Sequence, residues 1–353
     1  MPIKIAIDAR LFSRSMTGDT SYWRGLIHAL VRQESDIELF LVSNNKRPQE
    51  IPESERVHWI ELVGSDRMWS LVKFPLFARK IGADVVHVQY SLSPLVGKKG
   101  VTTVHDVSFF IGPQWFSTKD RLLLQRSVPA AIRRAARVFA VSQTACSEIE
   151  QFVPEAKGKT VVTFNALGDN IQVMDEAKAL EVVARIGVEP PYVFSVGTRW
   201  PRKNLSLAVE AAQLAGQKLV VSGKKGWGPE STNAMYTGYV SDVELTALYQ
   251  CASLYLAPSY HEGFGIPLLE AFACGCPVIC SPGGAMPEVA GGAAVVMDNF
   301  DPAEWAKHIQ ALLRDSSKLD AMDRLGRERV KDFSWESTAQ LTAKTYKQVA
   351  RGH

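Results

Sequence analysis

The segment between residues 259 and 270 combines two carboxylates with glycine and proline at spacings that could build a ligand site. Glu262 and Glu270 are eight positions apart, and the glycines between them allow the backbone to approach a ligand closely. Pro267 suits the first turn of a helix, and the N-terminus of such a helix is a ready site for an anion. The segment therefore predicts a loop and a helix start that bind a negatively charged ligand. The residues concerned are Ser259, Glu262, Gly263, Phe264, Gly265, Pro267 and Glu270.

Further candidate residues follow other apolar runs. Lys203 comes soon after a predicted strand end and Gly197, which favours a phosphate-binding role over that of a solvated charge at a helix start. His105 also follows an apolar strand and is a candidate functional residue, while Asp106 beside it could instead cap a turn. Gly18 lies in a loop rich in Ser, Thr and Gly, where it would serve either a ligand or the loop alone.

These residues need a scaffold, and the hydrophobic pattern predicts short strands that alternate with helices. Such alternation indicates βαβ units and parallel sheets. The expected strands are residues 4–8, 37–42, 84–89, 101–105, 138–141, 160–164, 192–196, 218–222, 254–257, 277–280 and 293–297. The expected helices are residues 22–32, 175–188, 205–215, 242–251, 267–274, 302–313, 318–331 and 335–349.

The fold class that this pattern predicts is α/β, with two Rossmann-like, doubly wound domains in series. We expect an N-terminal domain over residues 1–170, a second domain over residues 171–335 and a closing helix over residues 336–353. Ligands of such open sheets bind at the carboxyl ends of the strands. Two domains of this kind are therefore expected to face each other across a cleft that holds the active site.

Composition excludes several classes of protein. The net charge of +3 is too small to favour nucleic acid as the main partner. The five cysteines do not have zinc-site spacing and are expected to be free in a reducing compartment. No apolar run approaches the roughly 18 residues of a membrane-spanning helix, and the start lacks the pattern of a signal peptide. A cytoplasmic protein is expected.

The segment at 259–270 resembles the Glu-x7-Glu motif of retaining glycosyltransferases of family 4, which have the two-domain GT-B fold. Residues 197–204 resemble the pyrophosphate loop of that family, and residues 17–22 and 104–106 match its patterns in the first half. The likeness covers nearly the whole chain and is stronger in the second half. It implies that the last helix crosses back to the N-terminal domain.

The resemblance also implies roles for individual residues. Glu270 would accept hydrogen bonds from the ribose hydroxyls of a nucleotide, since a carboxylate can bind two donors. Glu262 and His105 would lie at the transferred sugar. Lys203 would hold the pyrophosphate, whose charge grows as it departs. The motif residues Ser259, Gly263, Phe264 and Gly265, together with Gly18, would contact the donor.

One position departs from the family pattern and leaves a role open. The usual arginine lies five residues before the lysine, where this chain has Thr198. Arg199 and Arg202 are both close enough in sequence to replace it. The resemblance further implies a nucleotide diphosphate sugar as donor, with GDP-mannose or a GDP-deoxyhexose favoured and UDP-sugars next. The acceptor would be a glycan or a lipid-linked molecule, and no essential metal is expected.

Two stretches of the first half mix basic and apolar residues, at 67–80 and 119–137. A basic amphipathic helix can lie on an anionic membrane surface, and it can equally form a solvated face over the core. Peripheral contact with the inner face of a membrane is therefore one of two open interpretations.

Other functions fit less well. A dinucleotide-dependent oxidoreductase would need Gly-x-Gly-x-x-Gly directly after a strand. Gly263 and Gly265 have the spacing of the first two glycines, but Leu268 stands where the third would be. A sugar-nucleotide epimerase of the same fold stays open because fold does not fix function. A non-catalytic sugar-nucleotide binding protein is disfavoured because Glu262, Glu270 and Lys203 are all present.

Overall fold

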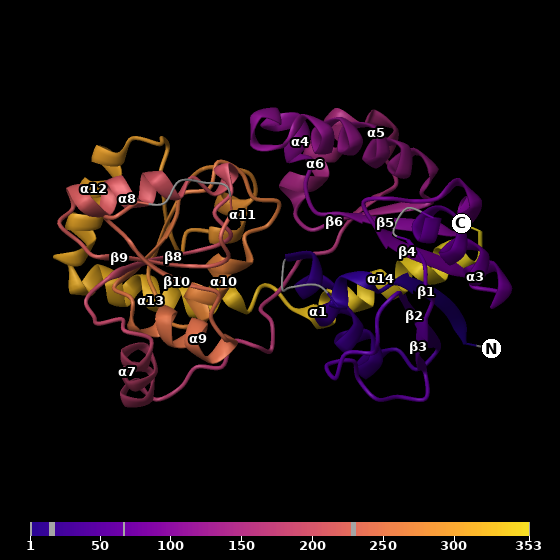
Figure 1. Cartoon of the computed structure of the whole chain (residues 1–353), viewed down its shortest axis with the longest axis horizontal. Coiled ribbons are helices and arrows are strands. Elements are labelled where there is room, and N and C mark those ends of the chain that lie inside the picture. Colours follow the sequence, from indigo (N-terminus) through magenta and orange to yellow (C-terminus); the bar gives the residue numbers. More distant parts are fainter. Residues whose placement is uncertain (1, 14–17, 66–67, 227–230, 353) are drawn as a thin grey trace. The chain divides into compact units, whose positions relative to one another are not determined.

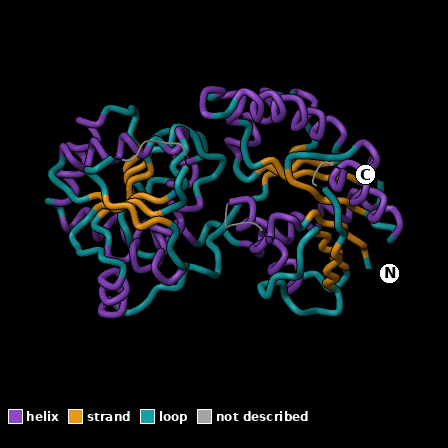
Figure 2. The backbone as a smooth tube through the Cα atoms, viewed as in Figure 1, coloured by secondary structure: helices purple, strands orange, loops and turns teal. Residues whose placement is uncertain are grey.

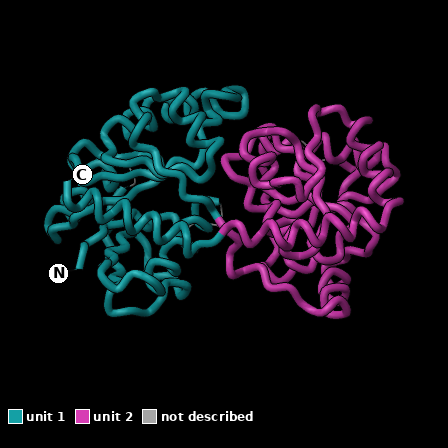
Figure 3. Tube along the Cα trace, turned by 180° about the vertical axis from the view of Figure 1, so that it is seen from behind, with its two compact units in different colours: residues 1–165, 334–353 teal, residues 166–333 magenta. Residues whose placement is uncertain are grey.

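The chain forms two compact units in a computed structural model that describes residues 2–13, 18–65, 68–226 and 231–352. The motif residue Thr17 and Arg67, at the start of the first basic stretch, lie outside the described residues. Unit 1 comprises residues 1–165 and 334–353, and unit 2 comprises residues 166–333 (Figure 3). The divisions thus fall at 165/166 and 333/334, where the sequence predicts 170/171 and 335/336.

Unit 1 contains a parallel seven-stranded sheet in the order β3-β2-β1-β4-β5-β6-β7. The chain therefore reverses direction across the sheet between β1 and β4, as in a doubly wound fold. Its strands are β1 (Ile3–Asp8), β2 (Ile37–Ser43), β3 (Val57–Glu61), β4 (Val85–Gln89), β5 (Gly100–Val104), β6 (Arg137–Ala140) and β7 (Thr160–Val162).

Helices cover both faces of this sheet (Figure 1). One apolar cluster joins α3, α4, α5 and α6 to the strands, while α1 and α14 pack together on the other face. The helical segments are η1 (Arg10–Ser13), α1 (Gly18–Gln33), η2 (Trp69–Lys73), α3 (Phe74–Lys80), η3 (Pro94–Lys99), α4 (Ser108–Ile111), η4 (Pro113–Trp115), α5 (Thr118–Arg134), α6 (Gln143–Phe152), η5 (Pro154–Ala156) and α14 (Trp335–Ala350).

Unit 2 repeats the architecture with a parallel six-stranded sheet in the order β10-β9-β8-β11-β12-β13. Helices surround the strands of this sheet (Figure 2). Its strands are β8 (Val193–Val196), β9 (Leu219–Ser222), β10 (Met235–Gly238), β11 (Leu254–Ala257), β12 (Val278–Cys280) and β13 (Val295–Val296). Its helices are α7 (Glu176–Arg185), η6 (Pro201–Lys203), α8 (Leu205–Leu214), α9 (Asp242–Cys251), α10 (Ile266–Ala273), α11 (Met286–Ala290), α12 (Pro302–Leu313) and α13 (Ser316–Val330). The predicted doubly wound α/β class is confirmed.

The sequence prediction missed several strands and helices that have few apolar residues. The edge strands β3 and β10 were missed because most of their residues are half-buried or exposed, so neither forms an apolar run. The helix expected at 22–32 begins four residues earlier, at Gly18, so Gly18 belongs to the helix and not to the loop in which it was predicted. Helix α6 was missed because its apolar residues are few.

The last helix, α14, packs in unit 1 through a buried polar network. The Tyr346 hydroxyl lies 2.5 Å from His87 Nδ1, and His87 Nε2 lies 2.8 Å from the Thr103 hydroxyl. Gly25 permits the close packing of α1 on α14, since a Cβ at that position would lie 2.0 Å from the Trp335 ring. Burial lowers the pKa of His87 to about 3, with a smaller contribution from the His105 charge, so the ring stays neutral.

Replacing Tyr346 with Phe is expected to destabilise the protein by about 1–3 kcal/mol, because a ring nitrogen of fully buried His87 loses its partner. Urea unfolding measures the change. Tyr239→Phe is the matched control, since Tyr239 is 60% exposed and the same atom is removed without burial. Equal stabilities of the two variants would show that the network does not hold α14.

Candidate active site

The candidate site of unit 2 lies where its sheet reverses strand order, between β8 and β11. In open α/β sheets ligands bind at the carboxyl ends of the strands at such a point. The loop after β8 carries the predicted cations, and the loop after β11 carries Glu262 and leads into α10. Sequence positions about sixty residues apart therefore meet at one edge of the sheet.

Glycine makes the loop after β8 possible. Gly197 has φ of +143°, and a Cβ there would lie 3.2 Å from Lys203 Cε. Gly223, directly after β9, approaches so closely that a Cβ would lie 2.3 Å from the Gly197 carbonyl oxygen. The chain then forms the short helix η6 and passes through Asn204 in the left-handed conformation. This path directs the Lys203 side chain back across Gly197.

Glu262 forms ion pairs with two cations from that loop. Lys203 Nζ lies 2.7 Å from Glu262 Oε1, and Arg202 Nη1 lies 3.0 Å from Oε2. The exposed fractions of the three side chains are 12% for Glu262, 15% for Arg202 and 16% for Lys203. Water therefore screens the cluster weakly, and its net charge of +1 favours an anion.

Opposing effects act on the ionisation of Glu262. Burial alone would raise the pKa of its carboxyl group, but the charges of Arg202 and Lys203 and a hydrogen bond from Ser259 outweigh burial and hold the pKa well below its usual range. Glu262 is therefore ionised throughout the neutral range, and both of its oxygens are bound to cations.

The backbone of Glu262 is fixed by the turn after β12. The Ala285 amide donates to the Glu262 carbonyl at 2.8 Å. A Cβ at Gly284 would lie 2.2 Å from the same carbonyl oxygen, and one at Gly283 would lie 2.3 Å from the Tyr260 carbonyl oxygen. The two glycines thus serve a close approach of backbones that places the carboxylate.

Glu270 lies on α10, which begins after Gly265 with Pro267 in its first turn, as predicted. The Tyr249 hydroxyl donates to Glu270 Oε2 at 2.9 Å. Burial raises the pKa of Glu270 to about 7, and the charge of nearby Asp242 adds to this, against the Tyr249 hydrogen bond and the Lys203 charge. The pKa of this carboxyl group therefore lies close to neutral pH. Tyr249 was not predicted, since an aromatic residue inside a helix gives no signal beyond core packing.

The other predicted donor residues of unit 2 have different surroundings. Arg199 is 7% exposed, and its guanidinium lies over the Tyr236 ring at 5.1 Å, whereas Arg202 joins Lys203 at Glu262. The Phe264 ring packs against Phe333 and is 3% exposed, so only its backbone could contact a ligand. Ser259 is buried and supports Glu262.

Gly18 and His105 belong to unit 1. Gly18 is the exposed first residue of α1, and His105 follows β5. His105 Nε2 lies 3.0 Å from Gln89 Oε1 and 3.6 Å from Asp19 Oδ1, and the ring is almost fully buried. Asp106 caps the next turn by accepting from the Ser108 amide at 2.8 Å, which was the alternative raised for it.

A pocket of about 150 Å³ lies at the carboxyl ends of β1 and β4, the strand-order reversal of unit 1. Tyr90 adopts φ of +61°, a strained conformation for a non-glycine residue. The pocket residues were not predicted, because the place where the strand order reverses is known only once the strands are paired. Asp8, at the end of the first strand, was the one signal in the sequence. They are Asp8, Arg10, Leu11, Asp19, Gln89 and Tyr90.

Comparisons with known proteins agree with this architecture. A model described as Glycosyltransferase Family 4 matches residues 17–167, and one described as Glycosyl transferases group 1 matches residues 178–329. Two doubly wound α/β units are the architecture of the GT-B glycosyltransferases, and the chain belongs to glycosyltransferase family 4.

A curated relative supports the family, and solved structures share the fold. O-antigen chain mannosyltransferase B of Escherichia coli is 32% identical over 269 residues, which cover 71% of this chain and 70% of that protein. Sucrose-phosphate synthase of Thermosynechococcus elongatus shares the fold, with a TM-score of 0.78 at 21% identity over 99% of this chain and 100% of that one. Anabaena HepE, solved with UDP-glucose, has a TM-score of 0.76 at 18% identity over 98% and 100%. Within the described residues, no helix is both long and apolar enough to cross a membrane.

Proposed function

We propose that this glycosyltransferase moves a hexose from a nucleotide diphosphate sugar to a hydroxyl group of a glycan or lipid-linked acceptor, with retention of anomeric configuration, in the biosynthesis of a surface polysaccharide. The observation that carries the proposal is the cluster of Lys203, Arg202 and Glu262 at the switch point of unit 2. Its net positive charge suits a diphosphate, and Glu270 on the next helix suits a ribose diol.

The favoured donor is GDP-mannose or a GDP-deoxyhexose. The 32% identical relative is named as an O-antigen chain mannosyltransferase, which supports mannose and a polysaccharide product. UDP-sugars come next, because the structurally similar HepE binds UDP-glucose.

In the proposed reaction the acceptor oxygen attacks C1 of the donor sugar. The bond between C1 and the phosphate oxygen breaks, and its electron pair goes to the diphosphate. Lys203 and Arg202 stabilise the charge that develops there. The acceptor proton passes to an oxygen of the leaving phosphate on the same face of the sugar, so that a new C1–O bond with the original configuration replaces the old one. Glu262 holds both cations in place and adjoins the transferred sugar.

The arginine that serves the diphosphate is proposed to be Arg202. It shares Glu262 with Lys203, whereas the Arg199 guanidinium packs on Tyr236. Arg202→Ala should therefore reduce transfer more than Arg199→Ala.

The acceptor is proposed to bind in the pocket of unit 1. Asp8 and Asp19 supply carboxylates for sugar hydroxyls, Tyr90 supplies an aromatic ring, and His105 lies beside Asp19 and Gln89.

Tyr90→Ala is expected to raise the KM for the acceptor by about tenfold, because a ring contact with a sugar is lost. The KM for the donor should stay within about twofold, since the change lies outside the donor site. Initial-rate kinetics with each substrate varied in turn separate the two. A change confined to the donor KM would contradict the assignment.

Calorimetric titration with GDP and UDP, with NAD as a control, tests the donor proposal. Binding of either GDP or UDP, without binding of the other diphosphate or of NAD, identifies the base. A screen of sugars linked to that nucleotide then identifies the hexose. Binding of NAD alone, or of nothing, would overturn the proposal. Release of altered free sugar nucleotide without transfer would favour an epimerase instead.

We also propose that transfer needs no metal ion, since two side-chain cations can neutralise the diphosphate. Excess EDTA should leave the rate within about twofold of its untreated value. A rate that falls in EDTA and returns with Mg²⁺ or Mn²⁺ would refute this. The proposed location is the cytoplasm, at the inner face of the membrane where a lipid-linked acceptor would lie.

A further inference from the structure

The charge of the chain is concentrated in one part of unit 1. Residues 68–137 hold eleven Lys and Arg against three Asp and Glu, although the whole chain has a net charge of only +3. The three acids are engaged locally. Asp84 accepts from the Lys4 amide, Asp106 from the Ser108 amide and Asp120 from the Ser117 hydroxyl. The segment therefore has a clear excess of cations, even though Arg133 is paired with Glu155 of η5.

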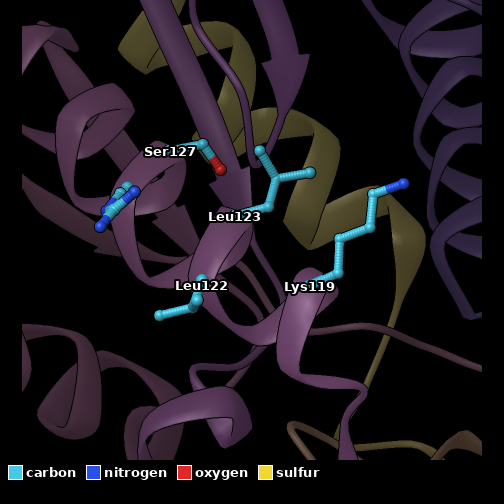
Figure 4. A pocket seen from close by; sticks show the side chains of 5 residues that line it. Lys119, Leu122, Leu123 and Ser127 are labelled. Carbon is cyan, nitrogen blue, oxygen red and sulfur yellow. The ribbon is translucent and has the colours of Figure 1, made fainter.

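Helix α5 presents both cations and leucines to solvent. Lys119, Leu122, Leu123 and Arg126 follow the i, i+3, i+4, i+7 spacing of one helix face and are all exposed. Leu122 is 42% and Leu123 is 61% exposed. They border an open hollow of about 470 Å³ with Lys119, Arg126 and Ser127 (Figure 4). The opposite face of the helix, with Val128 and Ile132, packs in the core.

The neighbouring segments have the same character. Helix α3 exposes Leu76, at 52%, together with Arg79 and Lys80, and η3 exposes Leu95, at 57%, together with Lys98. Helix η3 contacts both α3 and α5. Buried residues of α3 and α5 belong to one apolar cluster, together with residues beside η3, so the three segments lie on the same side of the sheet. The exposed surface of α3, η3 and α5 is called here the cationic face.

We propose that the cationic face docks the enzyme on a bilayer that contains anionic lipid. Lys and Arg at such a surface are attracted by the negative headgroups, and exposed leucines gain by insertion at the boundary of the acyl chains. Duplex nucleic acid would use the cations but would leave the leucines without an apolar partner. This surface goes beyond the sugar-transfer chemistry and gives the enzyme access to an acceptor held in the membrane.

Sedimentation with vesicles tests the proposal without any enzymatic reaction. Vesicles of phosphatidylcholine with roughly one third phosphatidylglycerol are compared with vesicles of phosphatidylcholine alone. The full-length protein should sediment with the first and stay in solution with the second. The variant Leu123→Ser with Arg126→Glu should bind the anionic vesicles about 30-fold more weakly, and high salt should release the wild-type protein.

The matched control is Leu325→Ser with Arg324→Glu on α13, where Leu325 is 54% exposed beside an exposed arginine in unit 2. This control should bind anionic vesicles like the wild type, and both double variants should keep wild-type melting temperatures. Equal loss in both variants, equal binding to the two kinds of vesicle, or binding to duplex DNA but not to vesicles would each overturn the proposal. Binding of a nucleotide is measured separately, so a failure of the proposed donor leaves this result intact.

Discussion

Replacing Lys203 with alanine is expected to lower kcat for sugar transfer by about 10²–10³-fold, because a fixed cation would be lost where the diphosphate gains charge. The side chain lies across Gly197 and is held by Glu262 at 2.7 Å, so the charge is already in place before the donor arrives. The KM for the donor should change less than kcat, since the leaving diphosphate carries more charge in the transition state than in the ground state. Initial rates with saturating acceptor measure both constants.

Lys218→Ala is the matched control. Lys218 is exposed and precedes β9, at the opposite end of the same sheet, so its loss should change kcat by no more than about twofold. Near-normal turnover of the Lys203 variant would remove this residue from the mechanism.

Replacing Glu262, the carboxylate paired with Lys203, should also lower kcat. Glu262→Gln keeps the shape of the side chain but removes the charge that holds Lys203 and Arg202, and a fall of about 10²-fold in kcat is expected. Gln is preferred to Ala because truncation would also leave a void beside two weakly exposed cations. Circular dichroism and a thermal melt verify that the fold is retained. Full activity of this variant would show that the ion pairs are structural only.

Replacing Glu270 with glutamine is expected to weaken binding of the nucleotide sugar by about 10- to 100-fold, because a carboxylate accepts two ribose hydroxyls and an amide oxygen does so less well. Wild-type affinity should also fall as the pH drops below about 7, where Glu270 becomes protonated. The diphosphate esters of a nucleotide sugar do not titrate in this range. Calorimetry between pH 6 and pH 8 should therefore show a dependence in the wild type that is absent in the variant.

The same substitution should stabilise the free enzyme. The pKa of Glu270 is raised by folding from 4.5 to about 7, so the folded state binds a proton more tightly than the unfolded state. The resulting stabilisation is complete below pH 4.5 and is lost as the pH rises through 7, where an ionised carboxylate is buried. Glutamine avoids that charge, and a gain of about 1–3 kcal/mol in unfolding free energy is expected at pH 8.

Urea unfolding at two pH values tests this second expectation. The gain should shrink toward zero at pH 4, where Glu270 is protonated in both states. Tyr249→Phe provides a comparison, because it removes the hydrogen bond from the Tyr249 hydroxyl that favours the ionised form of Glu270. A variant that loses stability at pH 8 and keeps its donor affinity would show that Glu270 is a structural residue and not a ligand for ribose.

Much of the fold follows from local pattern alone. Buried parallel strands such as β1, β8 and β11 are nearly continuous apolar runs, so their positions were predicted to within a few residues. The edge strands β3 and β10 could not be predicted in this way, because an edge strand is stabilised by its neighbour and needs no apolar run of its own.

The same distinction applies to the candidate sites. The residue types and spacing of the 259–270 segment, with Gly197 and Lys203, were enough to predict an anion site, because glycine, proline and charge act locally on loops and helix starts. The choice between Arg199 and Arg202 depends on where each side chain goes after the loop is folded. The structure places Arg202 with Lys203 at Glu262 and the Arg199 guanidinium over the Tyr236 ring.

The class of fold, the family resemblance and the segments predicted to carry the chemistry all follow from the sequence, because they depend on short-range pattern. The pairing of Glu262 with two cations, the raised pKa of Glu270 and the pocket shared by Asp8, Asp19 and Tyr90 became known from the folded structure. Pairing and burial join residues that are distant along the chain. A pKa or a pocket is a property of that joined environment, and no single segment contains it.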